Sequence, residues 1–182
     1  MLIAKEKKAK NIIEYIIYMF QIEDLIRSFD LDIQKIDQHI ISQFKVDNLI
    51  VQEMQAWYEG LIQQMKLEKI QVKGHFQFIR NLIFDLNDLH LYLIQKQNQE
   101  YLQYYSWAKS HITELQKKSK EENVNEIEAV LNGLYGVLML KLQKRELSDA
   151  TKESVEYLSK LMALLNQIYF KIAKGEMELN KV

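Results

Sequence analysis

The chain contains no proline, and its apolar residues recur at helical spacing along almost its whole length. Proline is the residue that most often ends or kinks a helix, because its ring fixes φ and its nitrogen carries no proton. Glycine, the other frequent helix breaker, occurs only five times in 182 residues. The sequence therefore predicts an all-α fold in which helices follow one another through short polar turns.

The length and composition suit one folded domain. A chain of 182 residues can bury its own hydrophobic core without a disulfide or a metal ion. The hydrophobic fraction of 48% and the charged fraction of 27% are typical of globular proteins. No low-complexity linker separates regions of different composition. We predict a single helical domain over residues 1–182, with a C-terminal tail that frays from about residue 175.

Apolar periodicity and potential capping residues predict seven helical segments. They are expected over about residues 3–29, 32–44, 47–73, 75–97, 100–118, 126–145 and 148–175.

The first of these segments differs from the rest, because apolar residues cover most of its circumference. Between Ile12 and Phe29, only Glu14, Gln21 and Ser28 form a clean polar strip. A helix that is apolar nearly all round is normally buried on all sides. We therefore expect a bundle of about six to seven helices around a largely buried N-terminal helix.

Charge, cysteine content and hydropathy exclude several classes of function. With 24 basic and 25 acidic residues the net charge is −1, whereas nucleic-acid binders usually carry a basic excess. The absence of cysteine excludes thiol catalysis, thiolate metal ligands and disulfides, and it suits a reducing compartment. No uninterrupted apolar stretch reaches the roughly 18 residues that a membrane span requires. We expect a cytoplasmic protein with neither a nucleic-acid nor a membrane partner.

No motif indicates a metal, a cofactor or a catalytic residue. A di-iron helical bundle would need the Glu-x-x-His pattern on two helices. The residues three positions before the four histidines are Ile36, Val72, Asn87 and Ala108. Glycine-rich phosphate loops, zinc-protease motifs and nucleophile elbows are missing as well. We expect no cofactor and no metal, and we consider an enzyme the less favoured class.

Three charged residues in the buried first helix form the leading candidate site. Glu23 and Arg27 lie four residues apart, on a side shared with apolar residues, and Asp24 lies three residues before Arg27. A desolvated charge must be paired or hydrogen-bonded. The group could therefore be a simple ion pair at the helix rim, a buried network that fixes packing, or a polar pocket in which Arg27 binds an anion.

His90 is a second candidate, because it projects from the apolar face of the segment at 75–97. It could be a core histidine whose two ring nitrogens both have partners, or a general base or proton switch. Asp88 cannot be its partner on the same helix, since two residues correspond to about 200° around the axis. Any carboxylate partner must come from another helix.

Small residues mark one side of the segment at 126–145. Ala129, Gly133 and Gly136 share this side, although glycine inside a helix costs up to about 1 kcal/mol relative to alanine. We expect a neighbouring helix to approach closely here, with a ligand or a dimer partner as the alternative.

Several stretches of the chain also carry a family resemblance. They are NIIEYIIYMFQIEDLIR at 11–27, WYE at 57–59, KGH at 73–75, DLHL at 88–91 and LYGVLMLKLQKRELS at 134–148. Together they resemble a family of short bacterial proteins known only as a domain of unknown function. The resemblance spans nearly the whole chain and implies an all-helical cytoplasmic protein. It supplies no activity and no catalytic residues.

Two functional hypotheses follow from these observations. The leading one is a non-enzymatic helical interaction or regulatory module that self-associates, as a homo-oligomer or with a protein partner. The alternative is a small-molecule-binding protein or enzyme, with a polar pocket near Glu23, Asp24, Arg27 and His90.

Overall fold

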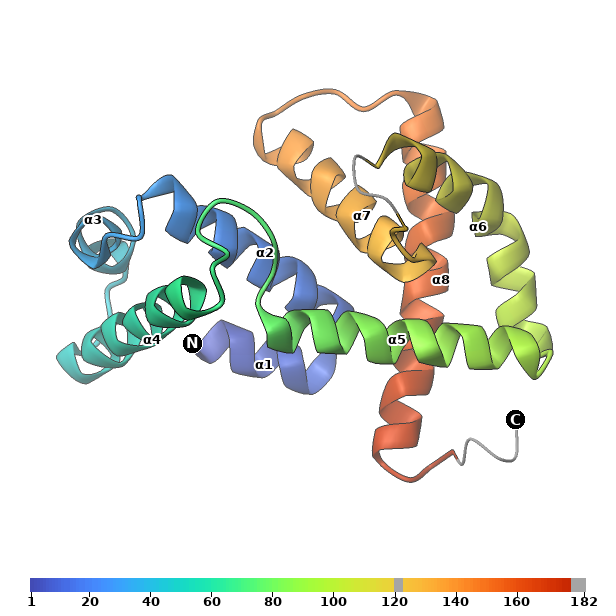
Figure 1. Cartoon of the computed structure of the whole chain (residues 1–182), viewed down its shortest axis with the longest axis horizontal. Coiled ribbons are helices and arrows are strands. Elements are labelled where there is room, and N and C mark those ends of the chain that lie inside the picture. Colours follow the sequence, from blue (N-terminus) through green and yellow to red (C-terminus); the bar gives the residue numbers. More distant parts are fainter. Residues whose placement is uncertain (120–122, 178–182) are drawn as a thin grey trace. The chain divides into compact units, whose positions relative to one another are not determined.

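The fold was examined in a computed structural model that describes residues 1–119 and 123–177. Within these ranges the elements are all helical, as Figure 1 shows, and no strand occurs. The predicted all-α helical bundle is confirmed. The last five residues of the tail predicted to fray, 178–182, lie outside the described ranges.

Eight α-helices and one short 3-10 helix make up the described chain. They are α1 (Leu2–Lys10), α2 (Ile12–Ser28), α3 (Ile33–His39), η1 (Ile41–Gln43), α4 (Asn48–Leu67), α5 (Gln77–Gln95), α6 (Gln99–Lys118), α7 (Glu126–Leu142) and α8 (Asp149–Ala173).

The chain divides into two compact units, which we call unit 1 (Met1–Asn81) and unit 2 (Leu82–Val182). Their boundary falls inside helix α5 rather than in a linker. That residues 1–182 form a single domain stays a prediction.

The expected first helix is interrupted at Asn11, which separates α1 from α2. Asn11 has an extended backbone, and its side-chain oxygen accepts hydrogen bonds from the backbone N–H groups of Ile13 and Glu14, both at 3.1 Å. This is an N-cap, in which a side chain satisfies the free donors of a helix start. The interruption accounts for one helix more than the seven that periodicity predicted.

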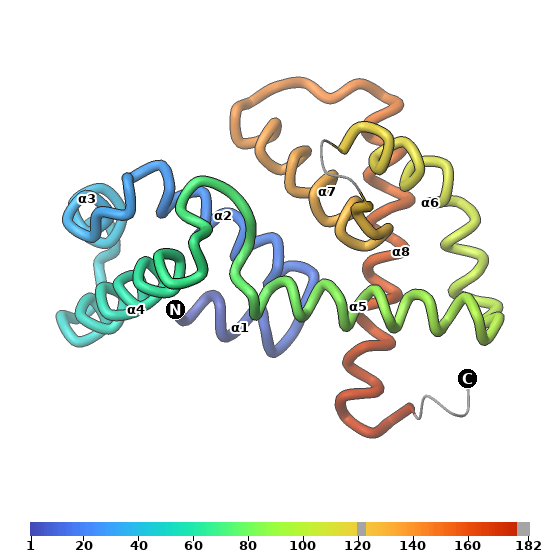
Figure 2. Tube along the Cα trace, viewed as in Figure 1, coloured from blue at the N-terminus to red at the C-terminus, as the bar shows by residue number. Residues whose placement is uncertain are grey.

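In unit 1, helix α2 is the buried part of the predicted N-terminal helix, and an arrangement of the other helices around it stays a prediction. Nine of the 17 residues of α2 are buried, whereas Ala4 alone is buried in α1. Within this unit α1 packs on α2, and α3, η1 and α4 contact one another (Figure 2). The burial of α2 places the charged side chain of Glu23 where water cannot reach it.

In unit 2, helix α6 contacts both α7 and α8, and α7 also contacts α8. The close approach predicted for the small residues of α7 is confirmed at Gly133. A methyl group there would lie 2.8 Å from a terminal carbon of Leu115 on α6. Gly136 has open space instead, so it is not needed for this contact.

Candidate functional site

Glu23 is fully buried, and both of its carboxylate oxygens bind the loop between α4 and α5 (residues 68–76). Oε1 accepts a hydrogen bond of 2.7 Å from the backbone N–H of Phe76. Oε2 lies 2.5 Å from Nδ1 of His75, whose ring stacks on Phe20 with 3.8 Å between the ring centroids. The buried carboxylate of Glu23 thus fixes the backbone just before α5 and orients the His75 ring.

Arg27 binds the same loop one helical turn further along α2. Its Nε and Nη2 atoms donate to the carbonyl of Ile70, at 3.3 and 3.2 Å, and Nη2 also donates to the carbonyl of Gly74. Nη1 forms an ion pair of 2.9 Å with Asp24. A guanidinium group suits this position, since its planar array of donors can serve several acceptors at once.

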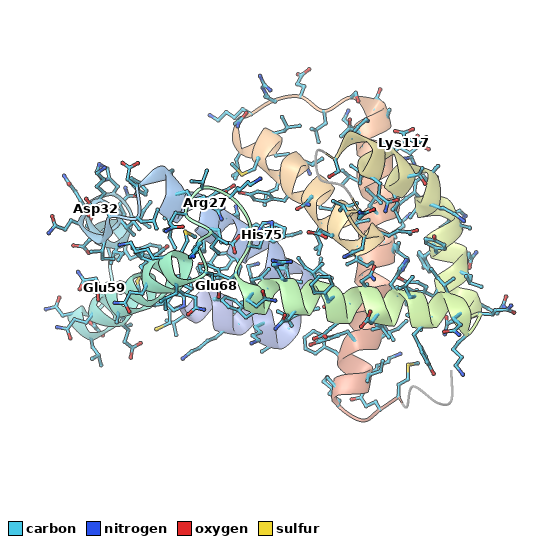
Figure 3. All side chains as sticks on the ribbon, in the orientation of Figure 1. Arg27, Asp32, Glu59, Glu68, His75 and Lys117 are labelled. Atoms are coloured by element: carbon cyan, nitrogen blue, oxygen red, sulfur yellow. The ribbon has the colours of Figure 1, made fainter. Side chains whose placement is uncertain are left out.

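These contacts include both a buried network with the α4–α5 loop and an ion pair at the helix rim, and an anion pocket at Arg27 stays a prediction. Figure 3 labels Arg27, His75 and Glu68 at this loop. Glu68, the first residue of the loop, connects the two ends of the loop, because its Oε2 accepts a hydrogen bond of 2.7 Å from the backbone N–H of Gln77. The guanidinium already binds two carbonyls and a carboxylate. An anion would therefore have to compete with these groups of the chain itself.

His90, the fourth predicted site residue, belongs to unit 2, whereas Glu23, Asp24 and Arg27 belong to unit 1. A pocket that combines all four stays a prediction. His90 is fully buried, and its Nδ1 lies 2.7 Å from the hydroxyl of Tyr101 on α6. Its Nε2 lies 3.3 Å from Oε2 of Glu126 on α7. The carboxylate partner comes from another helix, as the geometry of α5 required.

The charge state of this cluster follows from its geometry. Burial, followed by the charge of Glu126, raises the pKa of Tyr101, so its hydroxyl stays protonated and can donate to Nδ1 of His90. Interaction with His90, supported by the hydrogen bond from Tyr105 at 3.0 Å, lowers the pKa of Glu126. A neutral His90 then carries its proton on Nε2, facing the carboxylate. This tautomer is assigned from the partners.

The order hydroxyl, imidazole, carboxylate matches that of nucleophilic hydrolases, but two properties argue against that chemistry here. Tyr101 is fully buried, so no substrate can reach its oxygen. Burial also raises its pKa, which opposes formation of a tyrosinate. Nε2 of His90 and Oε2 of Glu126 lie at ion-pair distance without the alignment of a hydrogen bond. The cluster therefore connects α5, α6 and α7 through polar contacts.

A second histidine–hydroxyl pair, which sequence reasoning missed, joins α6 to α8. Nδ1 of His111 lies 2.9 Å from Oγ of Ser154, and the His111 ring stacks on Tyr157. The Ser154 hydroxyl also lies 2.9 Å from the carbonyl of Ala150. A hydroxyl has one proton, and donating it to the carbonyl leaves its oxygen to accept from His111. This arrangement does not activate serine for attack.

An apolar groove in unit 1 is the remaining candidate for a functional site. It is lined mainly by apolar side chains, unlike the polar pocket that the sequence predicted. It has a volume of about 230 Å³, and its lining comes from α1, α2, the turn after η1 and α4. Phe44 and Val46 are 44% and 41% exposed, and Leu2 and Ile3 are more exposed still. Leu49, which is 68% exposed, lies next to the lining residue Ile50. A gathering of exposed apolar side chains typically marks a contact surface.

Within the described part of the chain, no group of three or more histidine, aspartate or glutamate side chains could hold a metal ion. No helix in the described ranges is both long and apolar enough to cross a membrane.

Sequence reasoning missed several partners of the predicted residues. His75 belongs to the KGH stretch, which signalled only a resemblance, and Tyr101 stood in an aromatic-rich segment with no indication of its contact. Glu126 follows Asn125, whose side chain caps α7, so the sequence indicated only that a helix begins at Glu126. These residues lie far apart in the sequence, and no short sequence pattern indicates that they contact one another.

In the described ranges these features define a helical bundle in which Glu23, Arg27 and His90 contact other groups of the same chain. The chain belongs to the family described as a domain of unknown function, DUF4924, whose model matches residues 1–176. The resemblance to a domain of unknown function is thereby confirmed. No curated protein and no solved structure matches the chain.

Proposed function

We propose that this protein is a non-enzymatic helical interaction module that self-associates through the apolar groove of unit 1. The observation that carries the proposal is the exposure of large apolar side chains around this groove. Exposed apolar surface is unfavourable in water, and a protein partner that covers it contributes binding free energy. The buried polar groups of α2 offer no comparable site, since groups of the chain itself occupy them.

Charge around the groove favours a second copy of the same chain as the partner. Helix α1, which supplies Leu2 and Ile3 to the groove, carries four lysines and one glutamate and is therefore basic. Helix α4, which supplies Ile50 and Met54, carries Glu53 and Glu59 against the single Lys66 and is therefore weakly acidic. In a two-fold dimer each surface meets its own copy, so a basic α1 can face an acidic α4.

The test is the molar mass of the full chain across a concentration series, by size exclusion with light scattering. We expect a dimer, and we expect Phe44→Glu to weaken dimerisation at least about tenfold because it places a charge in an apolar contact. Val72→Glu is the matched control. It adds the same charge to unit 1 at a side chain that is 88% exposed and does not line the groove.

A wild-type monomer at millimolar concentration would disprove self-association. Equal weakening by Phe44→Glu and Val72→Glu would place the contact elsewhere.

We also propose a cytoplasmic location without a nucleic-acid partner. The absence of cysteine and a net charge of −1 support this. Cell fractionation and a salt-dependent DNA-retention assay test the two parts separately.

A further inference from the structure

Unit 2 contains a crevice that none of the contacts described above uses. It lies between α5 and α8 and has a volume of about 480 Å³, which is large enough for a small organic molecule. Its lining includes Asp85, Asp88, Tyr92, Tyr169, Ile172 and Ala173. It shares no residue with the groove of unit 1 and does not depend on self-association.

The walls of the crevice combine apolar and aromatic surface. Leu89, Ile172 and Ala173 supply aliphatic surface, and Tyr92 and Tyr169 supply two aromatic rings. Nζ of Lys96 lies 5.6 Å from the centroid of the Tyr92 ring, so a ligand cation would have to compete with this lysine for that ring. Such walls suit the apolar part of a ligand, and the Tyr169 ring could also meet a positive charge.

The polar groups of the crevice favour a cation. Asp85 and Asp88 form no hydrogen bond or ion pair with any described residue. Burial, followed by the charge of Asp85, raises the pKa of Tyr169, and both residues line the crevice. The Tyr92 hydroxyl oxygen is buried, so this residue presents its ring rather than its hydroxyl to the crevice. An ammonium N–H could donate to the two exposed carboxylates.

We propose that the crevice between α5 and α8 binds a small organic cation that joins an ammonium group to an apolar chain or ring. The two carboxylates would hold the ammonium group, and the apolar and aromatic walls would hold the rest. A divalent metal ion fits less well, since such ions take six or more oxygen ligands or retained waters, and the walls here are mainly apolar.

The experiment uses three probes of equal chain length on the full-length protein at pH 7. These are hexylammonium, 1-hexanol and hexanoate, titrated while amide shifts are followed by NMR. We expect hexylammonium to cause saturable shifts confined to residues 85–92 and 169–173. We expect it to bind at least about tenfold more tightly than hexanoate, because the carboxylates attract the one charge and repel the other.

The double substitution Asp85→Asn and Asp88→Asn removes both charges and keeps the shapes of two exposed side chains. We expect it to weaken hexylammonium binding about tenfold and to leave 1-hexanol binding nearly unchanged. Glu100→Gln with Glu153→Gln is the matched control, since it removes two exposed carboxylates of unit 2 outside the crevice. Tyr92→Phe removes a hydroxyl whose oxygen does not reach the crevice, and we expect it to leave the affinity for hexylammonium nearly unchanged.

The absence of saturable binding at millimolar hexylammonium would overturn the proposal. So would equal affinity for hexanoate, shifts that map outside the crevice, or the same loss of affinity in the control variant. Circular dichroism of each variant shows whether it is folded, and the 1-hexanol titration separates a lost charge from a lost crevice.

Discussion

At the residue level, Glu23 shows how a buried charge is stabilised by groups distant in sequence. Its two oxygens contact the N–H of Phe76 and the ring of His75, more than fifty positions away. Removing a partner from a buried charged group leaves the desolvation cost without compensation. The side chain of Asp24, the next residue along, is 49% exposed and therefore meets a different environment.

We therefore expect Glu23→Ala to lower the free energy of unfolding by about 2–4 kcal/mol, because it leaves the Phe76 N–H without its acceptor. Glu23→Gln keeps that acceptor and should cost less. Asp24→Ala is the control and should cost less than about 1 kcal/mol, as exposed ion pairs contribute little. Urea unfolding measures all three, and an equal loss at positions 23 and 24 would contradict the role assigned to Glu23.

The Glu126 carboxyl gives the molecule a pH dependence with a defined sign. Interaction with His90 lowers its pKa below the ordinary value of 4.5. A carboxyl whose pKa is lower in the folded state stabilises the fold at higher pH, and it loses that contribution as pH falls below about 4.5 toward the folded value. Thermal unfolding from pH 7 to 3 should show this loss, and Glu126→Gln should flatten it. An unchanged pH profile in the variant would disprove the coupling.

At the level of the helices, the two glycines of α7 have opposite surroundings. Gly133 faces Leu115 on α6 at a distance that leaves no room for a methyl group, and Gly136 faces open space. Gly60, on α4, also has open space around it. The helical cost of glycine is offset by close packing at the first position only.

Gly133→Ala should be less favourable than Gly136→Ala by about 1 kcal/mol, because the terminal carbons of Leu115 must shift to make room for the new methyl group. Gly136→Ala should stabilise it by up to about 1 kcal/mol, since only the gain in propensity remains. Thermal unfolding of both variants compares the two effects on one helix. A lower Tm for Gly136→Ala would indicate a contact at that position.

At the level of the whole molecule, the single-domain prediction can be tested with two natural probes. Trp57 lies in unit 1 and Trp107 lies in unit 2, and the chain contains no other tryptophan. Variants that keep one tryptophan each therefore report on one unit.

A single cooperative domain predicts that Trp57→Phe and Trp107→Phe variants unfold in urea with coincident fluorescence and circular-dichroism transitions. Fluorescence midpoints that differ from the circular-dichroism midpoint within one variant would show that the units unfold separately.

What could be predicted from the sequence was local in origin. The helix starts at Asp32 and Ser148 could be predicted from the sequence, because the side chains of these two residues accept hydrogen bonds from N–H groups two or three residues ahead. Asn11 caps α2 in the same way, but an asparagine within a long apolar pattern is also compatible with a continuous helix. The break between α1 and α2 was therefore not predicted. The candidate residues Glu23 and Arg27 stood out because they are charged within an apolar helix.

The sequence by itself determined the all-α class, the approximate positions of most helices and the apolar character that buries α2, because helical periodicity and capping act over a few residues. Only the tertiary structure decided what the buried polar groups bind: the α4–α5 loop for Glu23 and Arg27, and Tyr101 with Glu126 for His90. Such partners are brought together by packing between elements far apart in the chain, and no local pattern encodes that packing.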